Sequence, residues 1–246
     1  MDQKTKINKA LRALPVLEGC PPEVFERFVE GSIVSVHDKG KILFLQDEPA
    51  ERFYLLLSGW AKLFRETLDG AQAVVDVLSS GDLFGETAIF YENEYPFSAE
   101  IVERAELVSL PLALFKSEVE KNGAITLNTL HHLARHNRKQ GREIEHLALQ
   151  SAPQRIGCFL LRLFDQTQGG PVTIHLPYDK TLIAARLGMQ PETFSRALKK
   201  LRTETDIDVA GSTVTIGDIG RLSAYSCGGC SSGFPCDDLE HANCRH

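Results

Sequence analysis

The stretch that decides the fold of this chain covers residues 178–202 and reads YDKTLIAARLGMQPETFSRALKKLR. Its first half repeats apolar residues at helical spacing, namely Leu182, Ile183 and Leu187. Gly188 can adopt the left-handed conformation that ends a helix, and Pro191 suits the first turn of another. The stretch therefore predicts two short helices joined by a tight turn, which is a helix-turn-helix.

The second predicted helix has an apolar face and a polar face. The apolar stripe consists of Phe194, Leu198 and Leu201. The polar face carries Glu192, Ser195, Arg196 and Lys199. Six basic residues stand against one acid in residues 180–202, although the whole chain has a formal net charge of −6. A basic patch in an acidic protein suits a polyanion, so the polar face is the candidate reader of double-stranded DNA. The alternative is a three-helix packing module whose charges are solvated.

The motif Glu192-Thr193-Phe194-Ser195-Arg196 resembles the recognition helix of the CRP/FNR transcription regulators, and Glu-x-x-Ser-Arg is the form of the FNR branch. The resemblance implies TTGAT-like half-sites, with Arg196 donating to a guanine, Glu192 accepting from the paired cytosine, and Ser195 near a thymine. These roles suit the side chains, because arginine forks onto guanine and a carboxylate accepts from the cytosine amino group. The predicted DNA-binding set is completed by Lys180, Thr193 and Lys199.

Residues 32 to about 111 alternate short apolar runs with glycine turns, a pattern typical of a β-sandwich or jelly roll. The expected strands are residues 41–44, 53–58, 61–65, 73–78, 98–102 and 106–111. The glycine rhythm resembles the cyclic-nucleotide-binding β-roll of the CRP family, with glycines at Gly59, Gly70, Gly81 and Gly85. Amphipathic segments at residues 7–14 and 22–28 predict short helices before the roll.

Residues 81–90 resemble the phosphate cassette of that roll, where a glutamate binds a ribose hydroxyl, and Glu86 occupies the matching position. Nucleotide-binding members then place an arginine, followed by serine or threonine, on the cyclic phosphate. This chain has Phe97 and Ser98 there. Because phenylalanine cannot neutralise a phosphate, cyclic AMP is not the expected ligand. An effector pocket at Glu86, Phe97 and Ser98 would take haem or another small molecule, although most of the aromatic rings clustered nearby are expected to be core.

Residues 124 to about 150 have a helical pattern. A heptad seam that is polar in its middle would place Leu130, Asn137 and Ile144 at one position, with Leu133, Gln140 and Leu147 at the other. In the resembling family the matching helix pairs two subunits, so we expect a homodimer that meets successive major grooves about 34 Å apart. His132 and His136 have the spacing of metal ligands, but solvated or seam positions are expected for them.

Four cysteines with the spacing C-x2-C-x5-C-x7-C lie in the last twenty residues: Cys227, Cys230, Cys236 and Cys244. They could hold a [4Fe-4S] or [2Fe-2S] iron-sulfur cluster that senses oxygen or nitric oxide. Structural zinc with His241 or His246 in reserve, a disulfide switch, and a disordered tail of thiols are the alternatives. The family resemblance ends near residue 222 and does not cover this tail.

The two remaining cysteines do not point to a site. Cys20 is alone in the N-terminal region where FNR itself builds a cluster from several cysteines, so that form of sensing is not expected. Cys158 lies in an apolar stripe and is interpreted as core.

Composition and motifs exclude several classes of protein. The chain is 43% hydrophobic and 24% charged, with no apolar run of membrane-spanning length and no signal-peptide core. We therefore expect a cytoplasmic protein without a membrane partner. No Ser/His/Asp or paired-carboxylate set stands out, so an enzyme is not expected. A thiol oxidoreductase using Cys227 and Cys230, and a pure nucleotide-binding module, are the alternatives from other classes.

The sequence thus predicts an α+β protein with four parts. These are a β-roll sensor domain with N-terminal helices (1–122), a dimerisation helix (123–150), a winged helix-turn-helix domain (151–222) and a cysteine-rich tail (223–246). The predicted function is that of a dimeric CRP/FNR-type transcription regulator whose DNA binding follows a redox or gas signal at the tail. RNA polymerase is a further expected partner.

Overall fold

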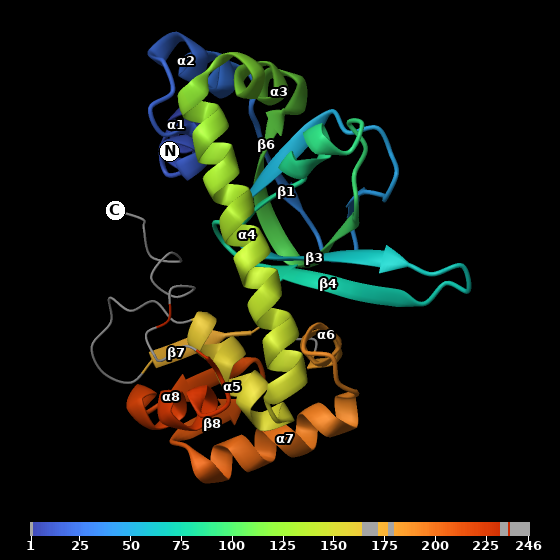
Figure 1. Ribbon diagram of the computed structural model, residues 1–246, viewed down its shortest axis with the longest axis vertical. Coiled ribbons are helices and arrows are strands. Elements are labelled where there is room, and N and C mark those ends of the chain that lie inside the picture. Colours follow the sequence, from blue (N-terminus) through green and yellow to red (C-terminus); the bar gives the residue numbers. More distant parts are fainter. Residues whose placement is uncertain (1, 164–171, 177–179, 232–235, 237–246) are drawn as a thin grey trace. The chain divides into compact units, whose positions relative to one another are not determined.

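The computed structural model describes residues 2–163, 172–176, 180–231 and 236 (Figure 1). The chain divides into two compact units, Met1–Arg135 and His136–His246. The expected class is confirmed, since a β-rich N-terminal part is followed by helices and a helix-turn-helix. The predicted ligand Cys244 and the reserve ligands His241 and His246 lie outside the described residues.

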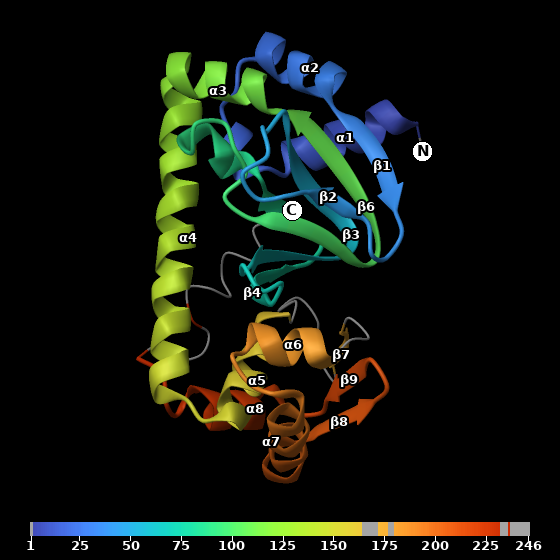
Figure 2. The same ribbon diagram turned by 90° about the vertical axis from the view of Figure 1, so that its right-hand side faces the viewer.

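Helices cover one end of the β-roll (Figure 2). They are α1 (Gln3–Arg12), the 3-10 helix η1 (Pro15–Leu17), α2 (Pro22–Gly31) and α3 (Leu112–Lys121). Each buries one apolar face: α1 buries Ile7 and Leu11, and α2 buries Phe25, Phe28 and Val29. Helix α2 begins at a proline, whose fixed φ suits a first turn. The two N-terminal helices confirm the amphipathic pattern.

The roll is an antiparallel sheet in the order β1-β6-β3-β4, with β2 paired to β6 and β5 paired to β3. Its strands are β1 (Ile33–His37), β2 (Ile42–Phe44), β3 (Arg52–Glu66), β4 (Gln72–Leu78), β5 (Leu83–Phe84) and β6 (Ser98–Pro111). Expected strands 53–58 and 61–65 are one strand, β3, and 98–102 and 106–111 are one strand, β6. The pairing shifts register around Gly59, which has φ +82 and a backbone close to that of Arg104. A bulge rather than a turn therefore explains this glycine.

The core of the roll lies along β3 and β6, where burial alternates only in places, since residues 107–110 of β6 are buried in succession. The fully buried residues include Phe53, Leu56, Ile101, Leu107 and Leu110. The expectation that the clustered rings are mostly core is met only in part. Phe84 and Tyr95 are buried, whereas Phe90 and Tyr91 are 51% and 56% exposed.

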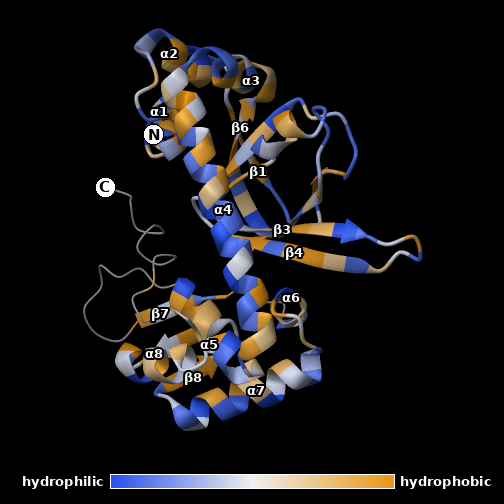
Figure 3. Ribbon diagram, in the orientation of Figure 1, coloured by the Kyte–Doolittle hydropathy of each residue, from blue (hydrophilic) through white to orange (hydrophobic). Residues whose placement is uncertain are grey.

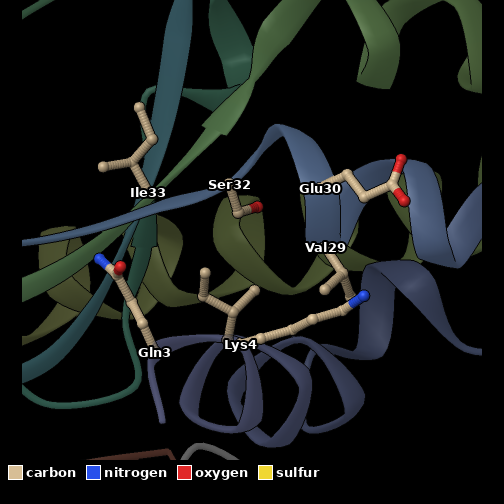
Figure 4. A pocket seen from close by; sticks show the side chains of 7 residues that line it. Gln3, Lys4, Val29, Glu30, Ser32 and Ile33 are labelled. Atoms are coloured by element: carbon tan, nitrogen blue, oxygen red, sulfur yellow. The ribbon is translucent and has the colours of Figure 1, made fainter.

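A shallow pocket of about 280 Å³ lies between α1, α2 and β1 (Figure 4). Its lining consists of Gln3, Lys4, Ile7, Val29, Glu30, Ser32 and Ile33. None of the predicted effector residues lines it, so this pocket is not the sensor site predicted from the cassette.

The long helix α4 (Gly123–Leu149) confirms the helical pattern of residues 124–150. The second unit continues with α5 (Ala152–Arg162), β7 (Val172–His175), α6 (Lys180–Arg186), α7 (Pro191–Glu204), β8 (Ile207–Ala210), β9 (Thr213–Ile216) and α8 (Ile219–Cys227). Strands β7, β9 and β8 form an antiparallel sheet in that order. Strands β8 and β9 pair as a hairpin after α7, within the predicted winged helix-turn-helix domain. In the described part of the chain, no helix has the length and apolar character needed to cross a membrane.

Candidate functional site

The turn of the helix-turn-helix is held by its own backbone. The amide of Met189 donates to the carbonyl of Ala184 (3.0 Å), and the amide of Gly188 donates to that of Ala185 (3.1 Å). Gly188 has φ +62, and a Cβ there would lie 2.8 Å from Cδ2 of Leu147. The backbone conformation therefore favours glycine at this position, and an added Cβ would also make the Leu147 side chain shift. Helix α7 then starts at Pro191, as predicted.

Helix α7 presents the predicted faces, and Figure 3 shows hydrophilic residues alternating with apolar ones along it. Phe194, Ala197, Leu198 and Leu201 are buried in the core of this unit. Exposed side chains on the opposite face belong to Glu192, Ser195, Arg196 and Lys199. Ser195 Oγ donates to the carbonyl of Pro191 at 3.0 Å. Among the described residues, the side chains of Arg196 and Lys199 have no hydrogen-bond or ion-pair partner, so both remain available to a ligand. Thr193 is half-buried and Lys180 is exposed at the start of α6.

Two of the six basic residues counted between residues 180 and 202 are already paired. Arg186 is half-buried, and its guanidinium donates to Oε1 of Glu143 on α4. The same carboxylate oxygen accepts from Arg162 of α5 at 3.2 Å. Arg202 donates to Oδ1 of Asp208 at 2.7 Å. The basic surface is therefore smaller than the sequence count implies.

The predicted effector residues do not face an open site together. Glu86 is buried in the 3-10 helix η2 (Glu86–Phe90), and its Oε1 lies 3.1 Å from Nε2 of His132 on α4. Its Oε2 is buried without a partner among the described residues. Ser98 is 4% exposed, and its Oγ accepts from the amide of Gln46 at 2.9 Å. The Ser98 hydroxyl therefore already has a structural partner.

A cation stands beside the residue that replaces the cassette arginine. The guanidinium of Arg65 lies 5.0 Å from the ring centroid of Phe97. Arg65 Nε also donates to the carbonyl of Pro96 at 3.3 Å. Only the tertiary structure identifies Arg65 as a neighbour of Phe97, because Arg65 lies on β3, thirty-two residues earlier in the sequence.

The two histidines at metal-ligand spacing have separate partners. His132 is half-buried against Glu86, as above, and His136 Nε2 lies 3.1 Å from the side-chain nitrogen of Gln140. His136 is exposed, as expected for a solvated or seam residue. The contact between His132 and Glu86 was not predicted, since only the fold brings residues 46 positions apart together.

One tail cysteine, Cys230, faces a histidine whose ring also faces Cys158. Cys227 ends α8, and the amide of Cys230 donates to its carbonyl at 3.1 Å. Cys230 Sγ lies 3.5 Å from Nε2 of His146 on α4, and Cys158 Sγ of α5 lies 3.9 Å from Nδ1 of the same ring. His146 is only 7% exposed. Cys158, which was interpreted as core, is half-buried, and its thiol also faces this imidazole.

Charge interactions place all four described thiols of this unit in one neighbourhood. Burial raises the pKa of the Cys158 thiol to about 11, Arg162 lowers it, and the thiols of Cys236, Cys227 and Cys230 raise it. Burial also raises the pKa of the Cys227 thiol, and the nearby thiols of Cys230 and Cys236 raise it further. Within the described ranges, no three or more His, Cys, Asp or Glu side chains are arranged to hold a metal ion.

Two family models match the chain. A cyclic nucleotide-binding domain matches residues 35–122, and a Crp-like helix-turn-helix domain matches residues 154–225. The crystal structure of a candidate cyclic nucleotide binding protein from Ruegeria pomeroyi is 34% identical in sequence, with a TM-score of 0.69. The similarity covers 90% of this chain and 97% of that one. The chain belongs to the CRP/FNR family of transcription regulators.

Further relatives of this CRP/FNR regulator span most of its length. The cyclic AMP receptor protein of Thermus thermophilus is 28% identical over 218 residues, which are 89% of this chain and 99% of that protein. The anaerobic regulatory protein of Bacillus subtilis is 25% identical over 176 residues, covering 70% of this chain and 74% of that protein. The predicted family resemblance is thereby confirmed, and with it a DNA-binding role for the chain.

Proposed function

We propose that this CRP/FNR regulator binds TTGAT-like half-sites as a homodimer and that its cysteine tail controls the binding. The observation that carries the first part is the outer face of α7, where Glu192, Ser195 and Arg196 are exposed in one row. Arg196 would fork onto a guanine, and Glu192 would accept from the paired cytosine. Lys199 and Lys180 would contact phosphates, which position the protein without reading sequence.

Fluorescence anisotropy with a labelled palindrome of two such half-sites tests this assignment. Replacing Arg196 with alanine should cost about 1 to 3 kcal/mol of binding free energy on the palindrome and relax specificity at one base pair. Replacing Lys199 with alanine should weaken binding to all sequences alike and lower the salt dependence by about one unit. Arg104→Ala, a matched charge removal on β6, serves as the control. An equal loss for Arg196→Ala on scrambled DNA would contradict base reading.

The proposed dimer rests on an exposed row along α4. Positions three and four residues apart are all exposed, and this row comprises Leu127, Leu130, Ala134, Asn137, Gly141, Ile144 and Ala148. Of the residues at the second predicted seam position, Leu133 is half-buried, whereas Gln140 and Leu147 are exposed, so the row shares Leu130, Asn137 and Ile144 with the predicted seam and borders the rest of it. The small residues at every seventh position would let two helices approach closely.

Light scattering after size exclusion tests the dimer. Ile144 is 69% exposed on this row, and replacing it with aspartate should shift the protein toward monomer. Leu149 is 68% exposed but lies off the row, so Leu149→Asp is the matched control. A monomeric wild-type protein, or equal dissociation by both variants, would refute this interface.

For the signal, we propose an iron-sulfur cluster held by the tail cysteines. The thiols of Cys227, Cys230 and Cys236 share a neighbourhood in the same unit as the helix-turn-helix. A relative named an anaerobic regulatory protein makes an oxygen-linked signal a natural choice. Such a cluster, when bound, supplies reactivity toward oxygen and nitric oxide. Iron, zinc and sulfide contents of protein purified without oxygen test this, and zinc alone would make the tail structural.

The contacts of α4 suggest how the tail would influence α6. The amide and hydroxyl of Ser231 donate to the carboxylate of Glu145 at 2.7 and 2.9 Å. Two residues earlier on α4, Glu143 accepts from Arg186, the last residue of α6. A tail that moves on loss of its cluster would therefore pull on the stretch of α4 that holds the helix-turn-helix.

A second candidate is a small-molecule effector in the β-roll. It is favoured by the buried, unpartnered Oε2 of Glu86 in the described structure, which could accept a ligand hydroxyl. Cyclic AMP remains an unexpected ligand, because Ser98 already has a backbone partner and Phe97 carries no charge. Calorimetric titration with cyclic AMP and a haem titration followed at the Soret band distinguish these effectors.

A further inference from the structure

One guanidinium of the second unit has no anion to pair with. Arg155 is half-buried in the first half of α5, and its Nε is buried without a hydrogen-bond partner. Among the residues that the structure describes, its side chain has neither a hydrogen bond nor an ion pair. Burial lowers the pKa of Arg155, and no charged group of the described residues offsets this shift. The side chain still carries its charge, because arginine keeps its proton in proteins.

Arg162 on the same helix shows what Arg155 lacks. The Nε of Arg162 is also buried without a partner in the described structure, but its Nη1 donates to Glu143 at 3.2 Å. Arg186 donates to the same carboxylate oxygen. Glu143 thus compensates two guanidiniums, whereas Arg155 has no such carboxylate. A charge that is partly withdrawn from water without compensation costs free energy in the folded protein. A binding site whose anion comes from a partner would account for that cost.

The place of Arg155 in the fold indicates which partner supplies the anion. Helix α5 packs against α7 (Figure 1). A Cβ on Gly188 would lie 3.9 Å from Nη1 of Arg155, so the guanidinium lies at the turn of the helix-turn-helix. Gly188 is exposed and lies three residues before Pro191, where α7 begins. Leu147, which is closest to the same Cβ, is 52% exposed. The outer end of the guanidinium is therefore next to solvent, beside the start of the recognition helix.

We propose that Arg155 binds a phosphate of the DNA backbone and thereby fixes the register of the recognition helix on the duplex. Guanidinium donors match the oxygens of a phosphate, often through two parallel hydrogen bonds. A phosphate contact positions the protein but reads no base. Helix α5, which lies outside the helix-turn-helix motif, then joins the DNA-binding surface. This contact goes beyond the proposed function, because it depends neither on TTGAT-like half-sites nor on the dimer or the tail cluster.

The sequence does not reveal this role for Arg155. The residue lies 33 positions before Gly188 and outside the basic stretch of residues 180–202. Only the packing of α5 brings it to the turn. Within the basic stretch, Arg186 and Arg202 are already paired with carboxylates. Arg155 therefore restores part of the positive charge that these two side chains do not offer to DNA.

Replacement of Arg155 should have opposite effects on folding and on DNA binding. Methionine keeps the aliphatic packing of the arginine stem but carries no charge and no donor. In the free protein, Arg155→Met removes an uncompensated charge, so the midpoint of urea unfolding should equal or exceed that of the wild type. In the complex, the same change removes a contact with phosphate. A residue that only stabilises the fold would instead lower the urea midpoint when it is replaced.

Fluorescence anisotropy of the full-length protein at several salt concentrations, on the palindrome and on scrambled DNA, tests the contact. Arg155→Met should bind both DNAs roughly tenfold more weakly at low salt. The slope of log K against log salt should fall by about one. Arg155→Lys keeps the charge and should retain the wild-type slope. Arg104→Met, which removes an exposed guanidinium from β6, is the matched control and should leave the slope unchanged.

A series of duplexes with one neutral methylphosphonate each locates the phosphate partner. At one position, the substitution should weaken binding by the wild-type protein but not by Arg155→Met, since this variant has already lost the contact. Equal losses for both proteins at every position would overturn the proposal. The wild-type arm of this series requires no variant.

The remaining outcomes are also decisive. An unchanged salt slope in Arg155→Met would overturn the phosphate contact, and so would an equal loss of slope in Arg155→Lys. A urea midpoint below that of the wild type, or failure of Arg155→Met to fold, would show that Arg155 stabilises the fold and would overturn it as well. If the wild-type protein does not prefer the palindrome, the proposed half-sites fail, whereas the slopes on scrambled DNA still test Arg155.

Discussion

An ion group anchors α4 to the helix-turn-helix, and the stability that it contributes can be estimated. Glu143 of α4 accepts from both Arg186 and Arg162, and the three side chains are only 17%, 12% and 19% exposed. Replacing Glu143 with glutamine removes the negative charge that the two guanidiniums share and keeps the shape of the side chain. Two guanidiniums would then remain half-buried opposite a neutral amide.

The expected loss follows from the cost of removing one partner of a buried ion pair. Breaking a buried ion pair by removing one partner costs about 3 to 5 kcal/mol. The glutamine oxygen still accepts a hydrogen bond, and the group retains some solvent contact, so we expect a loss of about 2 to 3 kcal/mol for Glu143→Gln. For a unit of this size, that loss lowers the midpoint of thermal unfolding by roughly 10 °C.

Thermal and urea unfolding followed by circular dichroism measure this loss, and anisotropy measures the accompanying weakening of DNA binding. Glu204→Gln removes the same charge from an exposed position at the end of α7. This control should stay within about 0.5 kcal/mol of the wild type. If Glu143→Gln destabilises the protein by no more than the Glu204 control, the ion group contributes nothing and the proposed anchor is refuted.

Three further outcomes are expected. Gly188→Ala should destabilise the protein more than Gly211→Ala, because both have positive φ but only Gly188 has a side chain within 4 Å of an added Cβ; unfolding curves with equal shifts would show that the contact is unimportant. Burial, and then the carboxylate of Glu118, raise the pKa of the Cys20 thiol, so at pH 8 iodoacetamide should alkylate it more slowly in folded than in urea-unfolded protein; equal rates would contradict this. Tyr95→Phe removes a donor to a backbone carbonyl at 2.6 Å and should cost about 1 kcal/mol in urea unfolding; an unchanged midpoint would mean that the bond adds no net stability.

Local periodicity was sufficient to predict the helix-turn-helix. The apolar stripe that begins with Phe194 and the break at Gly188 are short-range signals, and both appear in the structure at the expected residues. The strands were predicted less accurately. In the sequence, Gly59 predicted a turn, because glycine is common in turns. In the structure β3 and β6 stay paired on both sides of it, and the glycine forms a bulge in the ladder.

The candidate sites divide along the same line between short-range and long-range information. The exposed face of α7 and the tail motif lie in short stretches, so their residues could be named from the sequence. Contacts between distant elements could not be named in this way. Cys158 looked like core because its neighbours are apolar, and only the tertiary structure shows its thiol facing His146 of α4.

The sequence by itself determined the family, the recognition helix and the cysteine motif of the tail, since each is encoded in residues that are neighbours along the chain. Tertiary structure alone decided which charges remain available and which thiols meet. Arg186 counts as basic surface in the sequence but is neutralised by Glu143, and Glu86 matches a ribose ligand but is paired with His132. The physical reason is that pairing depends on distances between elements, which the chain sets only when its apolar faces pack.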